Sequence, residues 1–264
     1  MSPLFSIVTV TLNCVGQIEE TVRSVQTQTC TDYEYLVKDG GSTDGTIDRL
    51  RALGVDRIYS GADAGIYDAM NQAIALCQGQ FICFMNAGDT FASPHILAQA
   101  AEIIRQHPQQ SFFYGDLLTL EEHPLYGRGP DGLGRVVRFP DTYTRHDLFT
   151  DSVCQQTWFV KRRLYEEHPL DLSLSLNADH EFFIHWLTTD PSCARHLPFI
   201  TAHYAAGGAS ERQTAALRRQ RQQLMQRYFT WFERVMLTSR WRIRQLYRLV
   251  AHLGGGKQTD SSRR

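Results

Sequence analysis

The chain has 264 residues, 42% of them hydrophobic, and a formal net charge of −1, so it is long enough to bury a sizeable globular core. It contains no apolar run of about 18 residues and no signal-peptide pattern, so we expect a cytoplasmic protein without a membrane-spanning helix. Six scattered cysteines without metal-ligand spacing are typical of a reducing compartment. Residues 211–264 hold 13 Lys and Arg against 3 Asp and Glu, which predicts a basic tail with an anionic partner.

Hydrophobic periodicity predicts alternating strands and helices in the first 110 residues. Apolar, β-branched runs predict strands, and apolar residues spaced by three and four predict helices with one buried face. The expected strands cover 5–12, 33–39, 56–60 and 81–85, and the expected helices cover 18–28, 46–53, 66–77 and 94–105. This alternation predicts an α/β fold with a mostly parallel central sheet and helices on both faces.

The pattern changes after Ser111. We expect a strand over 112–120, a glycine-rich hairpin over 125–139, and then a strand, two helices and a last strand over 156–160, 162–167, 179–187 and 196–204. Residues 214–253 interleave arginines with aromatic and aliphatic residues, a composition typical of a helix at a membrane surface and equally of a docking or dimer face. We expect residues 254–264 to be disordered.

Two acidic turns follow predicted strands. Asp39 ends the second strand and precedes two glycines, and Asp89 closes the turn NAGD after the fourth strand. In open α/β sheets, ligands bind at the carboxyl ends of the strands. Asp39 could accept a hydrogen bond from a nucleobase or ribose, and Asp89 could hold a divalent cation that neutralises a diphosphate. Either residue alone is also typical of a turn or a helix cap.

The motifs VTVTLN, VKDGGSTDGT, SGADAGIYDAMNQAIALCQG and FMNAGD, in this order, resemble the family-2 glycosyltransferases with the GT-A fold. Within that family they are similar to colanic-acid exopolysaccharide enzymes of the WcaE type. The later segments CQQTWFV, LNADHEF and AAGGAS keep the order of that group, so the resemblance covers about residues 5–210. It implies a glycosyltransferase domain over 1–210, divided into a nucleotide-sugar half of about 1–120 and an acceptor half of about 121–210. A basic amphipathic helical region follows over 211–253.

The resemblance also implies which residues bind the donor. Asp39 would contact the base of a nucleoside diphosphate sugar. The remaining nucleoside, ribose and diphosphate contacts would come from Thr9, Asn13, Asp63, Gly65 and Asp68.

A divalent cation, Mn²⁺ or Mg²⁺, is the cofactor that the resemblance implies, with Asp89 as its ligand. Asn86 stands where an acidic residue usually opens the metal-binding signature. Its amide oxygen can still bind a cation, although with less charge. His203 or the loop over 207–210 could complete the site, while a histidine in a strand is also commonly structural.

On the acceptor side, the resemblance implies that Asp179 in NADHEF is the catalytic base. A carboxylate beside the acceptor hydroxyl removes its proton as the new glycosidic bond forms, and such a direct displacement inverts the anomeric centre. Glu181 is the rival, and Asp179 could instead stabilise the start of a helix. Gln155, Gln156 and Trp158 match the acceptor-side segment, where Trp158 would stack on a sugar or belong to the core.

These observations predict an inverting glycosyltransferase that uses a nucleoside diphosphate sugar, with a UDP-sugar favoured. Its acceptor would be a saccharide, carried on polyprenyl diphosphate, in surface polysaccharide biosynthesis. Residues 214–253 would hold the enzyme at the cytoplasmic face of the membrane or join copies in a homo-oligomer. The alternative is a non-catalytic sugar-nucleotide-binding or scaffold protein. The absence of a P-loop, of a GxGxxG fingerprint and of a nucleic-acid-binding motif argues against kinases, dehydrogenases and a nucleic-acid partner.

Overall fold

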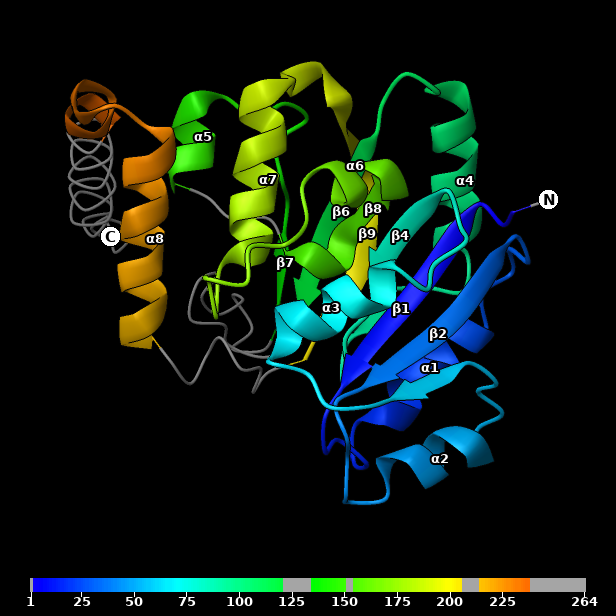
Figure 1. Ribbon diagram of the computed structural model, residues 1–264. Helices are drawn as coiled ribbons and strands as arrows, with labels where there is room; N and C mark the ends of the chain where they lie inside the picture. Colours follow the sequence, from blue (N-terminus) through cyan, green and yellow to red (C-terminus); the bar gives the residue numbers. More distant parts are fainter. Residues whose placement is uncertain (1, 121–133, 151–153, 206–213, 238–264) are drawn as a thin grey trace, which may run out of the picture.

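The computed structural model describes residues 2–120, 134–150, 154–205 and 214–237. These residues form a nine-stranded sheet with helices on both faces, which confirms the expected α/β class (Figure 1). No helix within these ranges is both long and apolar enough to cross a bilayer.

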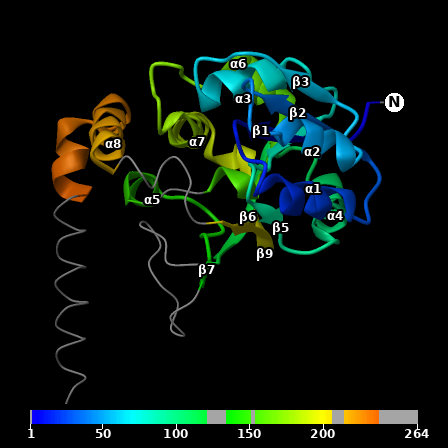
Figure 2. The same cartoon turned by 90° about the horizontal axis from the view of Figure 1, so that it is seen from below.

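The first half of the sheet is parallel, as the alternating pattern predicts. It contains β1 (Phe5–Thr11), β2 (Tyr33–Asp39), β3 (Ile58–Ser60) and β4 (Phe81–Phe84). The helices of this half are α1 (Ile18–Gln26), α2 (Thr46–Ala52), α3 (Ile66–Ile74) and α4 (Ile96–Gln106). Seen from below, α3 lies on one face of the sheet and α1 and α4 lie on the other (Figure 2). This half therefore carries the strand ends at which a ligand is expected.

The second half of the sheet mixes strand directions. It contains β5 (Thr90–Phe91), β6 (Phe112–Thr119), β7 (Arg135–Val137), β8 (Trp158–Lys161) and β9 (Ala194–Tyr204). The strand order is β3-β2-β1-β4-β8-β6-β9-β5, with β7 beside β6. β8 is antiparallel to both β4 and β6, so β6 runs in the same direction as β4, and β9 is parallel to β6. Six of the nine described strands therefore point the same way, namely β1, β2, β3, β4, β6 and β9. The sheet is thus mostly parallel by strand direction.

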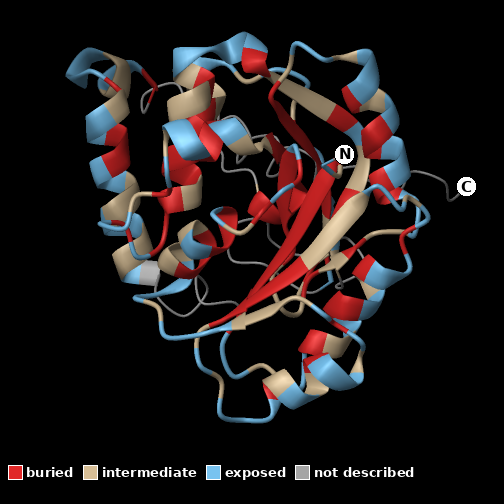
Figure 3. Ribbon diagram, turned by 45° about the vertical axis from the view of Figure 1, so that its right-hand side comes forward, coloured by how far each residue is buried: buried red, intermediate tan, exposed pale blue. Residues whose placement is uncertain are grey.

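Aromatic side chains fill the space between the second half of the sheet and its helices. The helices here are α5 (Arg145–Thr150), α6 (Arg162–Glu167) and α7 (Ala178–Thr189), with 3₁₀ turns at Gln155–Thr157 and Pro191–Cys193. Phe182 of α7 stacks on Tyr165 of α6 with ring centroids 4.4 Å apart, and Phe183 packs against Phe112 of β6. Figure 3 shows the middle of the sheet buried and the outer sides of the helices exposed. This packing fixes α7, and with it the start of the helix that carries Asp179.

The basic C-terminal region is two helices within the described residues, not one continuous helix. The first, α8 (Thr214–Tyr228), lies beside α7, and a second helical stretch covers 231–237 (Figures 1 and 2). Thr230 and Glu233 form a reciprocal capping box: Glu233 Oε2 accepts from the Thr230 N–H at 2.8 Å, and Thr230 Oγ1 accepts from the Glu233 N–H at 3.3 Å. This box starts the second helix. The predictions for 207–210 and 254–264, and part of the predicted hairpin over 125–139, lie outside the described residues.

Candidate active site

Asp39 is held by the turn that follows β2. Its buried carboxylate accepts from the N–H groups of Gly41 and Ser42 at 2.8 and 3.0 Å, and from the hydroxyls of Ser42 and Ser60 at 2.5 and 2.7 Å. Burial alone would raise the pKa of Asp39, but these hydrogen bonds outweigh it and lower the pKa. Asp39 is therefore an ionised carboxylate at the carboxyl end of β2.

Two further residues predicted to bind the donor belong to β1 and its exit. Asn13 adopts the left-handed conformation, with φ of 51°, and its Oδ1 accepts from the Thr43 N–H at 2.9 Å, so it fixes the turn after β2. Thr9 is fully buried, and its hydroxyl donates to the Met85 carbonyl at 2.8 Å. Thr9 thus ties β1 to the end of β4, and its contact with a nucleoside stays a prediction.

The loop before α3 carries the other predicted donor contacts. Asp63 Oδ2 lies 3.6 Å from the ammonium of Lys38, a nearly buried cation on β2, and Asp63 Oδ1 accepts from the Gly65 N–H at 3.0 Å. Gly65 has a φ of 128°, a conformation that favours glycine. Asp68 Oδ2 accepts from the Ala64 N–H at 2.8 Å. These contacts hold the loop and the start of α3 beside β2.

The residues predicted to bind a metal lie at the end of β4 and on β9, where His203 pairs with Thr90 of β5. The buried Asp89 carboxylate accepts from Gln156 Nε2 at 2.8 Å and from the Ala205 N–H at 3.0 Å. Asn86 Oδ1 is buried and has no hydrogen-bond partner within the described part of the chain. His203 pairs across β5 and β9 with the residue that follows Asp89, and partial burial lowers its pKa, which favours the neutral, ligating imidazole.

This donor set fits a hard divalent cation. A carboxylate and a buried amide oxygen that lacks a partner within the described residues are oxygen ligands of the kind that Mn²⁺ and Mg²⁺ prefer, and a neutral imidazole can join them on Mn²⁺. Gln156, predicted on the acceptor side, lies instead against Asp89 and orients that carboxylate.

Asp179 opens α7 and receives a hydrogen bond from α3. The Tyr67 hydroxyl donates to Asp179 Oδ1 at 2.7 Å across 112 residues of sequence. Burial raises the pKa of Asp179, and the bonds from Tyr67 and from the His180 N–H offset only part of that rise. Burial and the Asp179 charge together raise the pKa of Tyr67, so this hydroxyl stays protonated and keeps donating. The result is a carboxylate of increased basicity with a fixed orientation.

Cys154 lies near both Asp89 and Asp179. Its Sγ lies 2.6 Å from Gln156 Oε1, and the same glutamine amide donates to Asp89. Burial raises the pKa of the Cys154 thiol, and the negative charges of Asp89 and Asp179 raise it further. Both carboxylates therefore lie within electrostatic range of a single side chain.

Glu181 is separated from Asp179 although both lie in the first turn of α7. Its fully buried carboxylate accepts from His168 Nε2 at 2.9 Å and from the Tyr228 hydroxyl, and the Arg227 guanidinium lies 3.6 Å away. Glu181 therefore faces α8 and has no contact with the Tyr67 side of the helix.

The cluster around Glu181 brings together potential metal-binding atoms. Donor atoms of His168, Glu181 and His185 lie within 4.8 Å of one another. The two imidazole rings are stacked, with centroids 3.7 Å apart and planes inclined by 6°. One ion cannot lie in both ring planes at once, because the planes are parallel and separated. Together with Arg227, which already balances Glu181, this arrangement describes a structural contact between α7 and α8.

Trp158 and Gln155 are core residues in this structure. The Trp158 side chain is 1% exposed, with its ring 5.0 Å from that of Phe112 and 5.6 Å from that of Phe183. Gln155 is 4% exposed in the 3₁₀ turn before β8. The expectation that Trp158 stacks on an acceptor sugar is wrong for this conformation, because the indole is buried against aromatic side chains.

Helix α8 supports the segment that leads into Asp179, a role that sequence reasoning missed. Gln220 Oε1 accepts from the Leu176 N–H at 3.0 Å, and Asn177 Nδ2 donates to the Leu217 carbonyl at 3.1 Å. The composition of α8 indicated a basic helix but not these partners, which lie more than 35 residues away in sequence. The contact of Tyr67 with Asp179 was missed for the same reason, because 112 residues of sequence separate the two.

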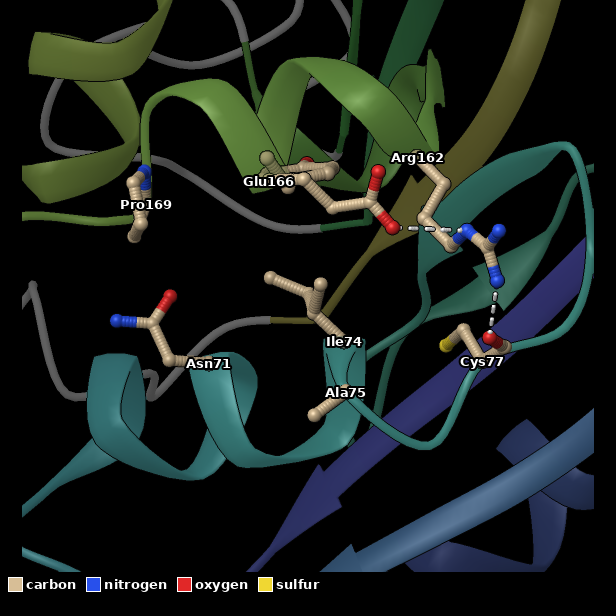
Figure 4. Close-up of a pocket in the computed structure, with 8 residues that line it drawn as sticks. Asn71, Ile74, Ala75, Cys77, Arg162, Glu166 and Pro169 are labelled. Atoms are coloured by element: carbon tan, nitrogen blue, oxygen red, sulfur yellow. Dashed lines mark hydrogen bonds and ion pairs between the residues drawn. The ribbon is translucent and has the colours of Figure 1, made fainter.

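A separate hollow of about 300 Å³ lies between α3 and α6 (Figure 4). Arg162 spans it, with one hydrogen bond to the Cys77 carbonyl at 2.8 Å and an ion pair to Glu166 at 3.2 Å. Asn71, at its edge, exchanges two hydrogen bonds with the backbone of Leu170 and is structural. Because Cys77 precedes β4, this hollow lies toward the amino end of that strand, away from Asp89.

Comparisons with known proteins agree with this arrangement. The family model described as Glycosyl transferase family 2 matches residues 6–168. A PGL/p-HBAD biosynthesis glycosyltransferase of Mycobacterium tuberculosis is 30% identical over 209 residues, which cover 77% of this chain and 77% of the relative. The putative teichuronic acid biosynthesis glycosyltransferase TuaG of Bacillus subtilis is 25% identical over 156 residues, covering 57% of this chain and 59% of that protein.

A solved structure supports the same fold. Glucosyl-3-phosphoglycerate synthase from Mycobacterium tuberculosis, in complex with Mn²⁺ and UDP-glucose, superposes with a TM-score of 0.61 at 15% identity, covering 86% of this chain and 79% of that one. At this identity the likeness concerns the fold alone. Together with the sequence matches, it shows that the chain has the GT-A fold and belongs to glycosyltransferase family 2.

Proposed function

We propose that this protein is an inverting glycosyltransferase that moves a sugar from a nucleoside diphosphate sugar to a saccharide acceptor. The observation that carries the proposal is the placement of two carboxylates, Asp89 and Asp179, around Cys154. One follows a central strand, where a diphosphate would bind, and the other opens a helix from the acceptor half of the chain.

The donor would lie along the carboxyl ends of β1, β2 and β4. Asp39 provides a negative charge at the base and ribose end, and the loop around Gly65 borders the diphosphate end. The similar fold that was solved with UDP-glucose favours a UDP-sugar as donor.

Asp89, Asn86 and His203 would hold a divalent cation. When bound, the cation would balance the negative charge of the donor diphosphate. Support comes from the buried, unpartnered Asn86 Oδ1 and from the Mn²⁺ in the similar solved structure.

Asp179 would act as the general base. Its raised pKa makes it a stronger proton acceptor than an exposed aspartate, and the Tyr67 hydroxyl fixes the orientation of the carboxylate that would receive the proton of the acceptor hydroxyl. Proton removal by such a base contributes about 10²–10⁴ in rate.

The acceptor would be a lipid-linked saccharide of surface polysaccharide biosynthesis. The name of TuaG, which refers to teichuronic acid, and the motif resemblance to colanic-acid enzymes support this class. A polyprenyl diphosphate carrier would place the reaction at the cytoplasmic face of the membrane.

The test is release of nucleoside diphosphate from UDP-, GDP- and dTDP-sugars, with and without Mn²⁺. The wild-type chain is expected to turn over at least one donor and to be stimulated by the metal. Asp179→Asn should bind that donor and lose about 10²–10⁴ in rate. Donor binding without turnover by the wild type, across donors and a range of saccharide acceptors, would instead favour the non-catalytic alternative.

A further inference from the structure

The helix over 231–237 exposes a large apolar surface at the edge of the molecule. Trp231 is 70% exposed and Phe232 66% exposed, the two highest values among the large hydrophobic side chains of the described residues. Val235 and Met236 are also exposed. These four residues follow one another at spacings of one, three and one, so they lie on one side of the helix.

The other side of this helix is fastened to the protein. Leu237 is buried, and Glu233 forms an ion pair with Arg145 of α5 at 2.7 Å. Arg234 donates to the Phe229 carbonyl at 2.7 Å. The Phe229 ring, fully buried, packs against Phe149 with centroids 5.4 Å apart. The helix is therefore anchored with its apolar side directed outward, and it lies at the rim beyond α8 (Figure 2).

The sequence around this helix is rich in arginine. Between 227 and 248 the sequence holds six arginines and one acidic residue, Glu233, whose charge is already balanced by Arg145. Two copies of such a segment would repel each other, whereas an anionic surface would attract it. The charge therefore favours a lipid surface over a second copy of the chain.

The sequence beyond the described residues continues the same pattern. Ile243, Leu246, Tyr247 and Val250 follow Phe232 at intervals that keep to one side of a helical repeat, and arginines occupy the positions between them. Aromatic and aliphatic residues opposite arginines are typical of helices that lie in the interface of a membrane.

We infer that the surface formed by Trp231, Phe232, Val235 and Met236, in this arginine-rich part of the sequence, docks on an anionic lipid bilayer. The sequence predicts a membrane contact within 214–253, and this inference narrows the contact to the helix over 231–237. Helix α8 is left out because its hydrogen-bonding groups hold the segment before Asp179. The inference does not depend on glycosyl transfer, since docking is measured without donor.

The experiment is flotation of the full chain with vesicles of phosphatidylcholine alone or mixed with phosphatidylglycerol. Wild type is expected to float with the anionic vesicles and to be released by high salt, because exposed charges are screened. The double variant Trp231→Ser/Phe232→Ser should lose binding at least tenfold. The matched control Leu120→Ser/Leu172→Ser, which removes two exposed leucines elsewhere, should bind as wild type does.

A second readout keeps the inference falsifiable if a variant folds poorly. Brominated lipids quench a tryptophan that enters the bilayer, so Trp231→Phe should retain vesicle binding and lose part of the quenching. Equal flotation of the wild type and the serine double variant would overturn the inference. An absence of flotation in wild type would also overturn the inference. This includes a wild type that does not float but dimerises as its concentration rises, with Trp231→Ser/Phe232→Ser abolishing the dimerisation.

Discussion

The hydrogen bond from Tyr67 to Asp179 should control how the activity depends on pH. Tyr67→Phe removes a 2.7 Å bond to the carboxylate and leaves the partly buried ring in place. A hydrogen bond to a charged group is worth about 1.5–3 kcal/mol, so its loss lowers the ionised fraction of Asp179 by about 10- to 150-fold at pH values below its pKa. Since the bond lowers the pKa of Asp179, its removal raises that pKa further.

The assay is kcat/KM for the preferred donor between pH 5 and 9. For Tyr67→Phe, the acid limb of the profile should move to higher pH, so that the loss is large at low pH and small above the pKa of the base. Tyr33→Phe is the matched control, because its hydroxyl bonds a helix carbonyl, that of Val25, away from the site. An equal loss at every pH, or a profile identical to that of wild type, would refute the role given to Asp179.

Three further predictions concern stability and metal binding. The folded state raises the pKa of Asp179, so at pH values above the ordinary pKa of an aspartate the ionised carboxylate destabilises the fold. Asp179→Asn should therefore raise Tm at pH 8. In calorimetry this gain should disappear as the pH falls below the ordinary pKa of an aspartate. Trp158→Ala should lower the free energy of unfolding by about 3–5 kcal/mol in urea titrations, whereas a sugar platform on the surface would cost little. Asn86→Asp should lower the Mn²⁺ concentration for half-maximal activity, on the order of tenfold, because it adds a charge to the ligand set; an unchanged Mn²⁺ titration would place the metal elsewhere.

The first half of the fold could be predicted from the sequence because each element there carries its own signal. β2 and the start of α3 were predicted at their observed positions, since an apolar run and a change of period mark each of them. β5 could not be predicted, because a strand of two residues is too short to show an alternation of side chains. The antiparallel direction of β8 was equally invisible, because side-chain alternation is the same in both directions.

The candidate site also contains residues that could be predicted from the sequence and residues that could not. Strand-end residues such as Asp39 and Asp89 follow from the position of the strands along the chain. Tyr67 could not be predicted, since it meets Asp179 only through tertiary packing. Trp158 was ambiguous because an indole serves equally well as a sugar platform or as core, and only the arrangement of Phe112 and its neighbours decides between them.

The central claim is that Asp89 belongs to the donor and metal site while Asp179 performs the chemistry. Calorimetric titration of the preferred nucleotide sugar in the presence of Mn²⁺, into Asp89→Asn and Asp179→Asn, tests it most directly. Asp89→Asn is expected to lose donor binding, whereas Asp179→Asn should bind donor as wild type does and fail only in turnover. Undiminished, Mn²⁺-dependent donor binding by Asp89→Asn would contradict it.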